Sequence, residues 1–137
     1  MGDDAGVTEE RPASTPEELQ RLAALIDEWA ERQLDNPLVA AVERDDSGEH
    51  RWFVRVLGEE KSVFSIWFLL RQRSLFVETY VLPAPEENAA QVYEYLLRQN
   101  PGIFGMSFGI GPEDALYLTG EVHNDGVTDA ELDRLLG

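Results

Sequence analysis

Large and small side chains alternate over residues 102–111, which read GIFGMSFGIG. The small residues are Gly105, Ser107, Gly109 and Gly111, and bulky apolar residues stand between them. Successive residues of a β-strand point to opposite faces, so this spacing predicts a strand with one bulky face and one bare face. A bare face is typical of a place that another backbone or a helix approaches closely. We therefore expect this stretch to lie in a sheet with a close neighbour.

A glycine-rich phosphate-binding loop is the main alternative for this stretch. A P-loop requires a Lys followed by Ser or Thr after its glycines, and a dinucleotide-binding motif requires a strand before them and a helix after. No Lys follows Gly111, and the next residues, PEDALYLTG at 112–120, read as a turn and a strand. The sequence therefore favours sheet architecture over phosphate binding.

Capping residues and apolar periodicity predict three helices. The first begins at Thr15, Pro16 and Glu18, which combine a capping box with a proline at the first helical position. An apolar stripe with helical spacing follows these residues. The second helix begins within residues 85–88, and the third follows Thr128, which has Glu131 three residues later.

Strand patterns fill the segments between these helices. Apolar or alternating runs at 50–57, 63–70 and 75–82 are joined by short polar turns, and 103–111 and 115–122 supply two more. The order α-β-β-β-α-β-β-α, with room for an extra short strand near 38–44, predicts an α+β fold built on an antiparallel meander.

Turn lengths give a register for the three central strands. With a loop at 59–61, Phe53 lies opposite Trp67, and with a two-residue turn at 71–72, Phe76 lies on the other side of Trp67. The other face of these strands then holds the predicted core. Its members are Trp52, Val54, Val56, Phe64, Ile66, Phe68, Leu75 and Val77.

The register also places Arg55, Ser65 and Glu78 in a row across the strands. This row lies beside the row formed by Phe53, Trp67 and Phe76. The small Ser65 would let Arg55 and Glu78 reach toward each other above it. Two interpretations of this mixed face stay open: it packs under another helix, or it binds a partner protein, because aromatic residues and Arg are enriched at interfaces. The candidate partner-binding residues are Trp67, Phe53, Phe76, Arg55 and Glu78.

The chain is strongly acidic, with 27 acidic and 11 basic residues and a net charge of −16. Charge of this sign repels phosphate backbones, so we expect no nucleic-acid partner. The charge either keeps the protein soluble or attracts a basic partner. The first residues lack a signal-peptide pattern and no stretch reaches the ~18 apolar residues of a membrane span, so we expect a cytoplasmic protein with no membrane partner.

Residues with catalytic or metal-binding chemistry form no recognisable pattern. The chain has no Cys, and His50 and His123 lack a second His at metal-ligand spacing. The sequence HNDG at 123–126 is typical of a turn. Glu78 is the one carboxylate whose position in an apolar strand needs an explanation, and pairing with Arg55 supplies one. We expect no catalytic residues, no metal site and no cofactor, and therefore no enzyme.

Several motifs resemble those of the actinobacterial branch of the YbjN-domain proteins. They are FVRV at 53–56, LRQRSL at 70–75, ETYVLPAPEEN at 78–88, VYEYLLRQN at 92–100 and a pattern that spans 108–121. The resemblance covers about residues 16–137 and implies a fold like that of class I type III secretion chaperones. Proteins of that shape are small, acidic, cytoplasmic and usually dimeric, and they bind extended segments of client proteins. The family is regarded as sensory or regulatory and offers no catalytic residues to carry over, and the fold alone does not imply secretion.

We expect a single domain over 14–137, preceded by a disordered acidic tail over 1–13. The function that we expect first is a non-enzymatic interaction or regulatory module, chaperone- or adaptor-like, that forms a homodimer and binds a protein partner through the mixed face. One alternative is a sensor domain that binds a small ligand in a pocket beside the 103–111 strand. An enzyme that uses Glu78, Tyr80 and Arg55 in an open cleft is the least favoured alternative.

Overall fold

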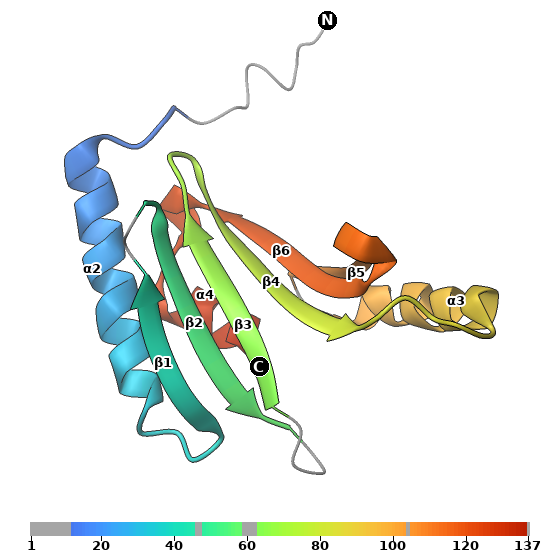
Figure 1. The fold of residues 1–137 in the computed structure, drawn as a ribbon. Helices are drawn as coiled ribbons and strands as arrows, with labels where there is room; N and C mark the ends of the chain where they lie inside the picture. Colours follow the sequence, from blue (N-terminus) through green and yellow to red (C-terminus); the bar gives the residue numbers. More distant parts are fainter. Residues whose placement is uncertain (1–11, 46–47, 59–62, 104, 137) are drawn as a thin grey trace, which may run out of the picture.

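The computed structural model describes residues 12–45, 48–58, 63–103 and 105–136, which form one six-stranded antiparallel sheet and three helices (Figure 1). The elements are α2 (Pro16–Gln33), β1 (Val39–Asp45), β2 (His50–Leu57), β3 (Val63–Leu70), β4 (Ser74–Leu82), α3 (Ala89–Gln99), β5 (Met106–Ile110), β6 (Leu116–His123) and α4 (Asp129–Leu136). Three short 3-10 turns are η2 (Asn100–Gly102), η3 (Pro112–Asp114) and η4 (Asn124–Gly126). The predicted α+β class and order are confirmed. Most of the tail predicted at 1–13 lies outside the described residues.

The first helix begins as its capping residues predict. The Thr15 Oγ1 accepts a hydrogen bond from the Glu18 backbone N–H at 3.2 Å, and the Glu18 Oε1 accepts one from the Thr15 N–H at 2.7 Å. The bond from the Thr15 backbone lowers the pKa of the Glu18 carboxyl, because it stabilises the charged form. This reciprocal cap fixes the point at which the chain turns into α2.

One face of the sheet is covered by α2 and α4 and forms the core (Figure 1). Trp29 of α2 packs edge-on against Phe68 of β3, with ring centroids 5.4 Å apart, and its Nε1 donates to Asp133 of α4 at 2.9 Å. Trp52 of β2 is also buried, and its Nε1 donates to Asp27 of α2 at 2.8 Å. Each large aromatic ring is therefore buried with its polar atom satisfied, which joins the two helices to the sheet.

The predicted core face is confirmed at most of its positions. Five of the predicted residues are buried and two are partly buried: Trp52, Val54, Phe68, Leu75 and Val77, then Val56 and Ile66. Phe64 is the exception, with 40% of its surface exposed. Phe64 is the second residue of β3, and its ring packs over Gly58 instead of under a helix.

The first three strands pair as predicted. The extra strand expected near 38–44 is β1, which pairs antiparallel with β2. Between β2 and β3, Phe53 lies opposite Trp67 and Arg55 lies opposite Ser65. The loop predicted at 59–61 lies outside the described residues.

The predicted register of β3 and β4 is wrong by two residues. Trp67 lies opposite Glu78, and Phe76 lies opposite Leu69. The turn between these strands is formed by Gln72 and Arg73, because the Arg71 N–H donates to the Ser74 carbonyl oxygen at 2.9 Å, whereas the prediction placed the two-residue turn at 71–72. Because side chains alternate with period two, this shift changes partners across the strands but leaves every side chain on its predicted face.

The alternating stretch forms a strand, β5, as predicted, and this strand lies at the edge of the sheet. Met106 is buried on the helix side, while Ser107 and Gly109 are exposed on the other side. The close neighbour expected on this bare side is absent at Gly109, where a Cβ would meet no described atom within 4 Å beyond its chain neighbours. A close neighbour is present at Gly111, where a Cβ would lie 2.5 Å from the ring of Tyr117. The adjacent strand has another close approach, because a Cβ on Gly120 would lie 2.5 Å from the carbonyl oxygen of Gly105.

The second helix, α3, projects from the edge of the sheet and covers neither face (Figure 1). Leu96 is buried, but Tyr95 and Leu97 are each 63% exposed. Consecutive helical residues are about 100° apart around the axis, so these two side chains flank Leu96 on opposite sides. The interpretation that the mixed face packs under another helix is therefore wrong for the described part of the chain.

Candidate functional site

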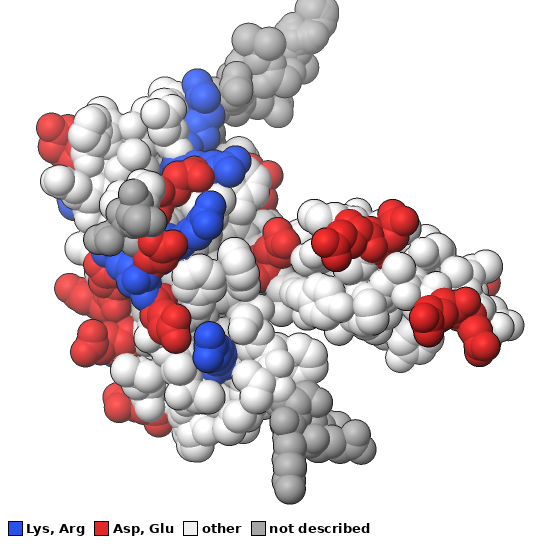
Figure 2. All heavy atoms as spheres, in the orientation of Figure 1, with Lys and Arg blue, Asp and Glu red and all other residues white. Residues whose placement is uncertain are grey.

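The sheet surface that points away from α2 and α4 is covered by no element of the described chain, and we call it the open face (Figures 1 and 2). It consists of the side chains of β2, β3, β4 and β6 that alternate with the core residues. Figure 2 shows basic and acidic side chains side by side on this face, next to an uncharged area. An uncovered sheet face with an apolar area is typical of a protein-interaction surface.

Aromatic side chains occupy the middle of the open face. The rings of Phe53 and Trp67 meet edge to face, with centroids 4.7 Å apart and planes at 75°. Trp67 is 47% exposed and Phe76 is 36% exposed. Leu69, half-buried, lies directly opposite Phe76 and two residues along β3 from Trp67, on the same face. These four residues, Phe53, Trp67, Leu69 and Phe76, form what we call the aromatic centre.

All five candidate partner-binding residues lie on the open face, but two of their predicted contacts are absent. Phe76 lies beside Leu69 instead of Trp67. Arg55 and Glu78 form no ion pair, because the two-residue shift moves Glu78 away from the row of Arg55. The guanidinium of Arg55 instead lies 3.8 Å from the carboxylate of Glu43 on β1.

The arginines of the open face already have carboxylate partners. Arg51 and Arg71 both lie near Glu49, at 3.9 and 3.0 Å, and Arg71 also stacks over the ring of Phe76 at 5.4 Å. Glu78 has no ion pair with any residue that the structure describes. The same is true of Glu121 on β6.

A hollow of about 590 Å³ lies on the open face beside the aromatic centre. Small residues of β5 and β6 border it, with Phe76 on one side and two carboxylates at its rim. The named lining residues are Phe76, Glu78, Gly105, Ser107, Thr119 and Glu121. The bare side of the alternating stretch therefore creates open space on the sheet, and this hollow is the space nearest to the ligand pocket expected beside 103–111.

Several residues of the open face are missing from the predicted set. Tyr80 is 48% exposed and meets Tyr117 edge to face, with centroids 5.7 Å apart. Leu69 and Tyr80 follow from the same alternation that identified Trp67 and Phe76, so continuing that pattern could have found them. Tyr117 and Glu121 had no such signal, because β6 pairs with β4 across a long connection that turn lengths do not describe.

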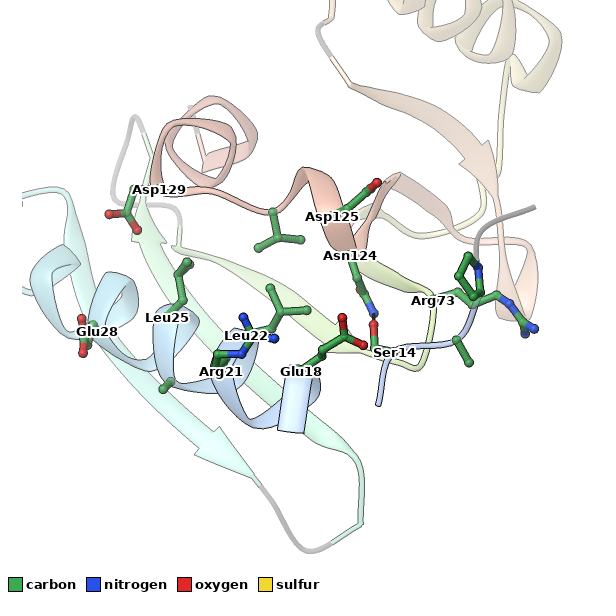
Figure 3. A pocket seen from close by; sticks show the side chains of 14 residues that line it. Ser14, Glu18, Arg21, Leu22, Leu25, Glu28, Arg73, Asn124, Asp125 and Asp129 are labelled. Carbon is green, nitrogen blue, oxygen red and sulfur yellow. Dashed lines mark hydrogen bonds between the residues drawn. The ribbon is translucent and has the colours of Figure 1, made fainter. Parts of the chain in front are cut away.

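A second depression, a groove of about 820 Å³, lies between α2 and η4 (Figure 3). Asn124 of η4 is buried and points toward Ser14 in this view. Its Nδ2 donates to the Ser14 Oγ at 2.9 Å and to the backbone carbonyls of Arg71 and Gln72 at 2.9 and 3.0 Å. Asn124 therefore joins the segment before α2, the β3–β4 turn and η4, and we call it the asparagine clasp. The groove contains none of the candidate residues.

The two histidines occupy surface positions in the sheet. The Nδ1 of His50 lies 2.6 Å from the guanidinium of Arg44, and its ring stacks on Trp52 at 6.2 Å. His123 is exposed at the end of β6. Within the described ranges, no three His, Asp or Glu residues are grouped so that they could hold a metal ion. No helix in those ranges is both long enough and apolar enough to cross a membrane.

Comparison with known proteins relates most of the chain to one family. Residues 23–137 match the YbjN family, whose description is "Putative bacterial sensory transduction regulator". An uncharacterized protein of Mycobacterium tuberculosis H37Rv is 32% identical over 84 residues, which are 61% of this chain and 46% of that protein. An uncharacterized protein of Mycobacterium leprae is 31% identical over 87 residues, or 64% and 47% of the two chains. The chain thus spans about half the length of these curated relatives.

Proposed function

The chain belongs to the YbjN family, and from this premise we propose that it is a non-enzymatic regulatory or adaptor module that binds a protein partner through the open face. The observation that carries the proposal is the uncovered aromatic centre, in which Trp67 is 47% exposed in the middle of a regular sheet. Trp residues supply a large share of binding energy at protein interfaces when a partner buries them. The arginines beside the aromatic centre belong to the other residue type enriched at such interfaces.

The sheet geometry supports an extended segment of a partner as the bound element. The open face presents its side chains in rows across β2, β3, β4 and β6, and no described helix obstructs them. An extended segment places alternate side chains on one side, with a spacing that can match such rows. We therefore propose a chaperone- or adaptor-like mode in which apolar residues of the partner pack on the aromatic centre.

Replacing Trp67 with Ala should separate binding from folding. We expect the free energy of unfolding to fall by only about 1 kcal/mol, because the side chain is half-exposed and loses mainly its contact with Phe53. We expect retention of the partner to fall about tenfold or more. The measurement is affinity purification from the native host with quantitative mass spectrometry, together with urea denaturation.

The matched control is Phe64→Ala, because Phe64 is 40% exposed in the same strand but lies on the other face. This variant should retain the same proteins as the unmodified chain. A set of captured proteins that Trp67→Ala leaves unchanged would contradict the proposal.

We also propose that the protein is a homodimer joined through α3. The support is that α3 exposes Tyr95 and Leu97 on opposite flanks, while the domain itself buries only Leu96 of this helix. Light scattering should give a mass of twice the 15.4 kDa of one chain. A mass of one chain over a range of concentrations would contradict a dimer. The expected cytoplasmic location and the lack of a nucleic-acid partner stay predictions.

The hollow beside β5 supports a second candidate function, a sensor domain for a small ligand. Its volume of about 590 Å³ falls within the range of small-molecule sites. A metabolite that stabilises the protein in a thermal-shift screen, and no longer does so after Ser107→Leu fills the hollow, would favour the sensor over the partner-binding module.

A further inference from the structure

We propose that the partner segment carries a Lys or Arg side chain whose cationic group lies between Glu78 and Glu121, over the hollow beside the aromatic centre. This inference rests on the proposed function and names the chemistry of the partner at that surface. It concerns the two carboxylates of the open face that have no partner within the described chain.

The distribution of ion pairs on the open face is the first support. Arg55 has Glu43 at 3.8 Å, and Arg51 and Arg71 share Glu49 at 3.9 and 3.0 Å. These arginines are therefore already close to negative charge. The unbalanced charge beside the aromatic centre is negative, although the aromatic centre itself is flanked by basic residues.

The sheet register brings the two unpaired carboxylates close together. Glu78 on β4 lies opposite Thr119 on β6, and Phe76 on β4 lies opposite Glu121. Glu78 and Glu121 are therefore diagonal neighbours on one face, which in antiparallel sheets places their Cβ atoms about 7 Å apart. One ammonium or guanidinium group can approach both carboxylates at this spacing.

The surroundings suit a long basic side chain. Phe76 stands beside both carboxylates and borders the hollow. The Arg71 guanidinium stacks over its ring at 5.4 Å, and the part of Phe76 that borders the hollow can pack against the apolar stem of Lys or Arg. Gly105, which has no side chain, and the small Ser107 border the hollow and leave room for that stem over the sheet. Apolar residues on the same side of the partner segment would then reach the aromatic centre.

The overall charge of the chain favours a basic protein segment on the open face over a second copy of the chain or a nucleic acid. The chain has a net charge of −16, so a basic segment is attracted, while a second copy docked on the open face would bring like charges together. Phosphate backbones are disfavoured for the same reason.

The experiment measures binding of three fluorescein-labelled eight-residue peptides by fluorescence anisotropy at ~150 mM salt, where weak long-range attraction is screened. All three alternate Val or Leu with a second residue, which is Lys in the first peptide, Ser in the second and Glu in the third. We expect the Lys peptide to bind at least tenfold more tightly than the Ser peptide and the Glu peptide to bind least, since two exposed ion pairs together supply about a tenfold effect.

A pair of double variants locates the binding. Glu78→Gln with Glu121→Gln should weaken binding of the Lys peptide about tenfold. The matched control, Glu28→Gln with Glu31→Gln, removes the same charge from α2, on the other side of the sheet, and should leave binding within about twofold. All four glutamates lie on the surface, so both variants should fold, and circular dichroism and thermal melting verify this.

Three outcomes would overturn the inference. Equal weakening by both double variants would mean that the peptide responds to net charge alone. Equal binding of the Lys and Ser peptides would mean that the partner needs no cationic side chain. If Trp67→Ala then abolished binding of both peptides, the proposed function would still be supported. Binding by none of the peptides would also overturn the inference, and the affinity purification with Trp67→Ala would then decide the proposed function separately.

Discussion

Replacing Phe68 with Ala is expected to lower the free energy of unfolding by about 3–5 kcal/mol. Phe68 is fully buried in the centre of the sheet, and its ring packs edge-on against Trp29 of α2 at 5.4 Å. The substitution removes most of a large apolar side chain and leaves a cavity between the sheet and α2. Because the neighbours are held by their own hydrogen bonds to α2 and α4, we expect little collapse into that space.

The matched control for this prediction is Phe64→Ala in the same strand. Phe64 is 40% exposed, so its removal should cost about 1 kcal/mol. Urea denaturation followed by tryptophan fluorescence measures both variants. Equal costs for the two substitutions would contradict the placement of the core between β3 and α2.

Replacing Asn124 with Ala is expected to cost about 2 kcal/mol of unfolding free energy. The two N–H bonds of the Asn124 side-chain amide are shared among three acceptors, the Ser14 hydroxyl and the backbone carbonyls of Arg71 and Gln72. Each lost bond costs about 1 kcal/mol, and the Gln72 carbonyl keeps the Ser14 backbone N–H as a second donor. Hydrogen exchange should show faster exchange of the Ser14 amide, which donates to the Gln72 carbonyl at 2.7 Å, because the segment before α2 loosens.

The control for the asparagine clasp is Ser14→Ala, which removes one of the three acceptors and leaves both carbonyl contacts. It should cost about 1 kcal/mol or less. If Asn124→Ala proved no more costly than Ser14→Ala, the two backbone contacts would contribute nothing to stability, contrary to the prediction.

The faces of the strands were predicted more accurately than the partners across them. Side-chain alternation placed Trp67, Phe76 and Glu78 on the open face, and all three are there. The register that paired Phe76 with Trp67 was wrong, because it depended on the exact position of one turn. An error of two residues leaves the face of every side chain unchanged, so the candidate residues were correct in position while the ion pair of Arg55 and Glu78 was not.

Long-range features of the site had no local signal. Glu121 is a diagonal neighbour of Glu78 because β6 pairs with β4, and no turn connects these two strands directly. Asn124 lies in a sequence typical of a turn, and its hydrogen bonds join segments more than fifty residues away. These contacts depend on how distant parts of the chain come together.

The sequence by itself determined the type of each element, the capping of α2 and the face on which most side chains lie. These properties depend on periodicity and on neighbours within a few residues, which the chain carries in its order. Only the tertiary structure decided that α2 and α4 share one side of the sheet, that α3 stands away from it, and that the aromatic centre is uncovered. Such choices depend on packing between residues far apart in the chain, where many arrangements satisfy the same local pattern and the burial of the whole core selects among them.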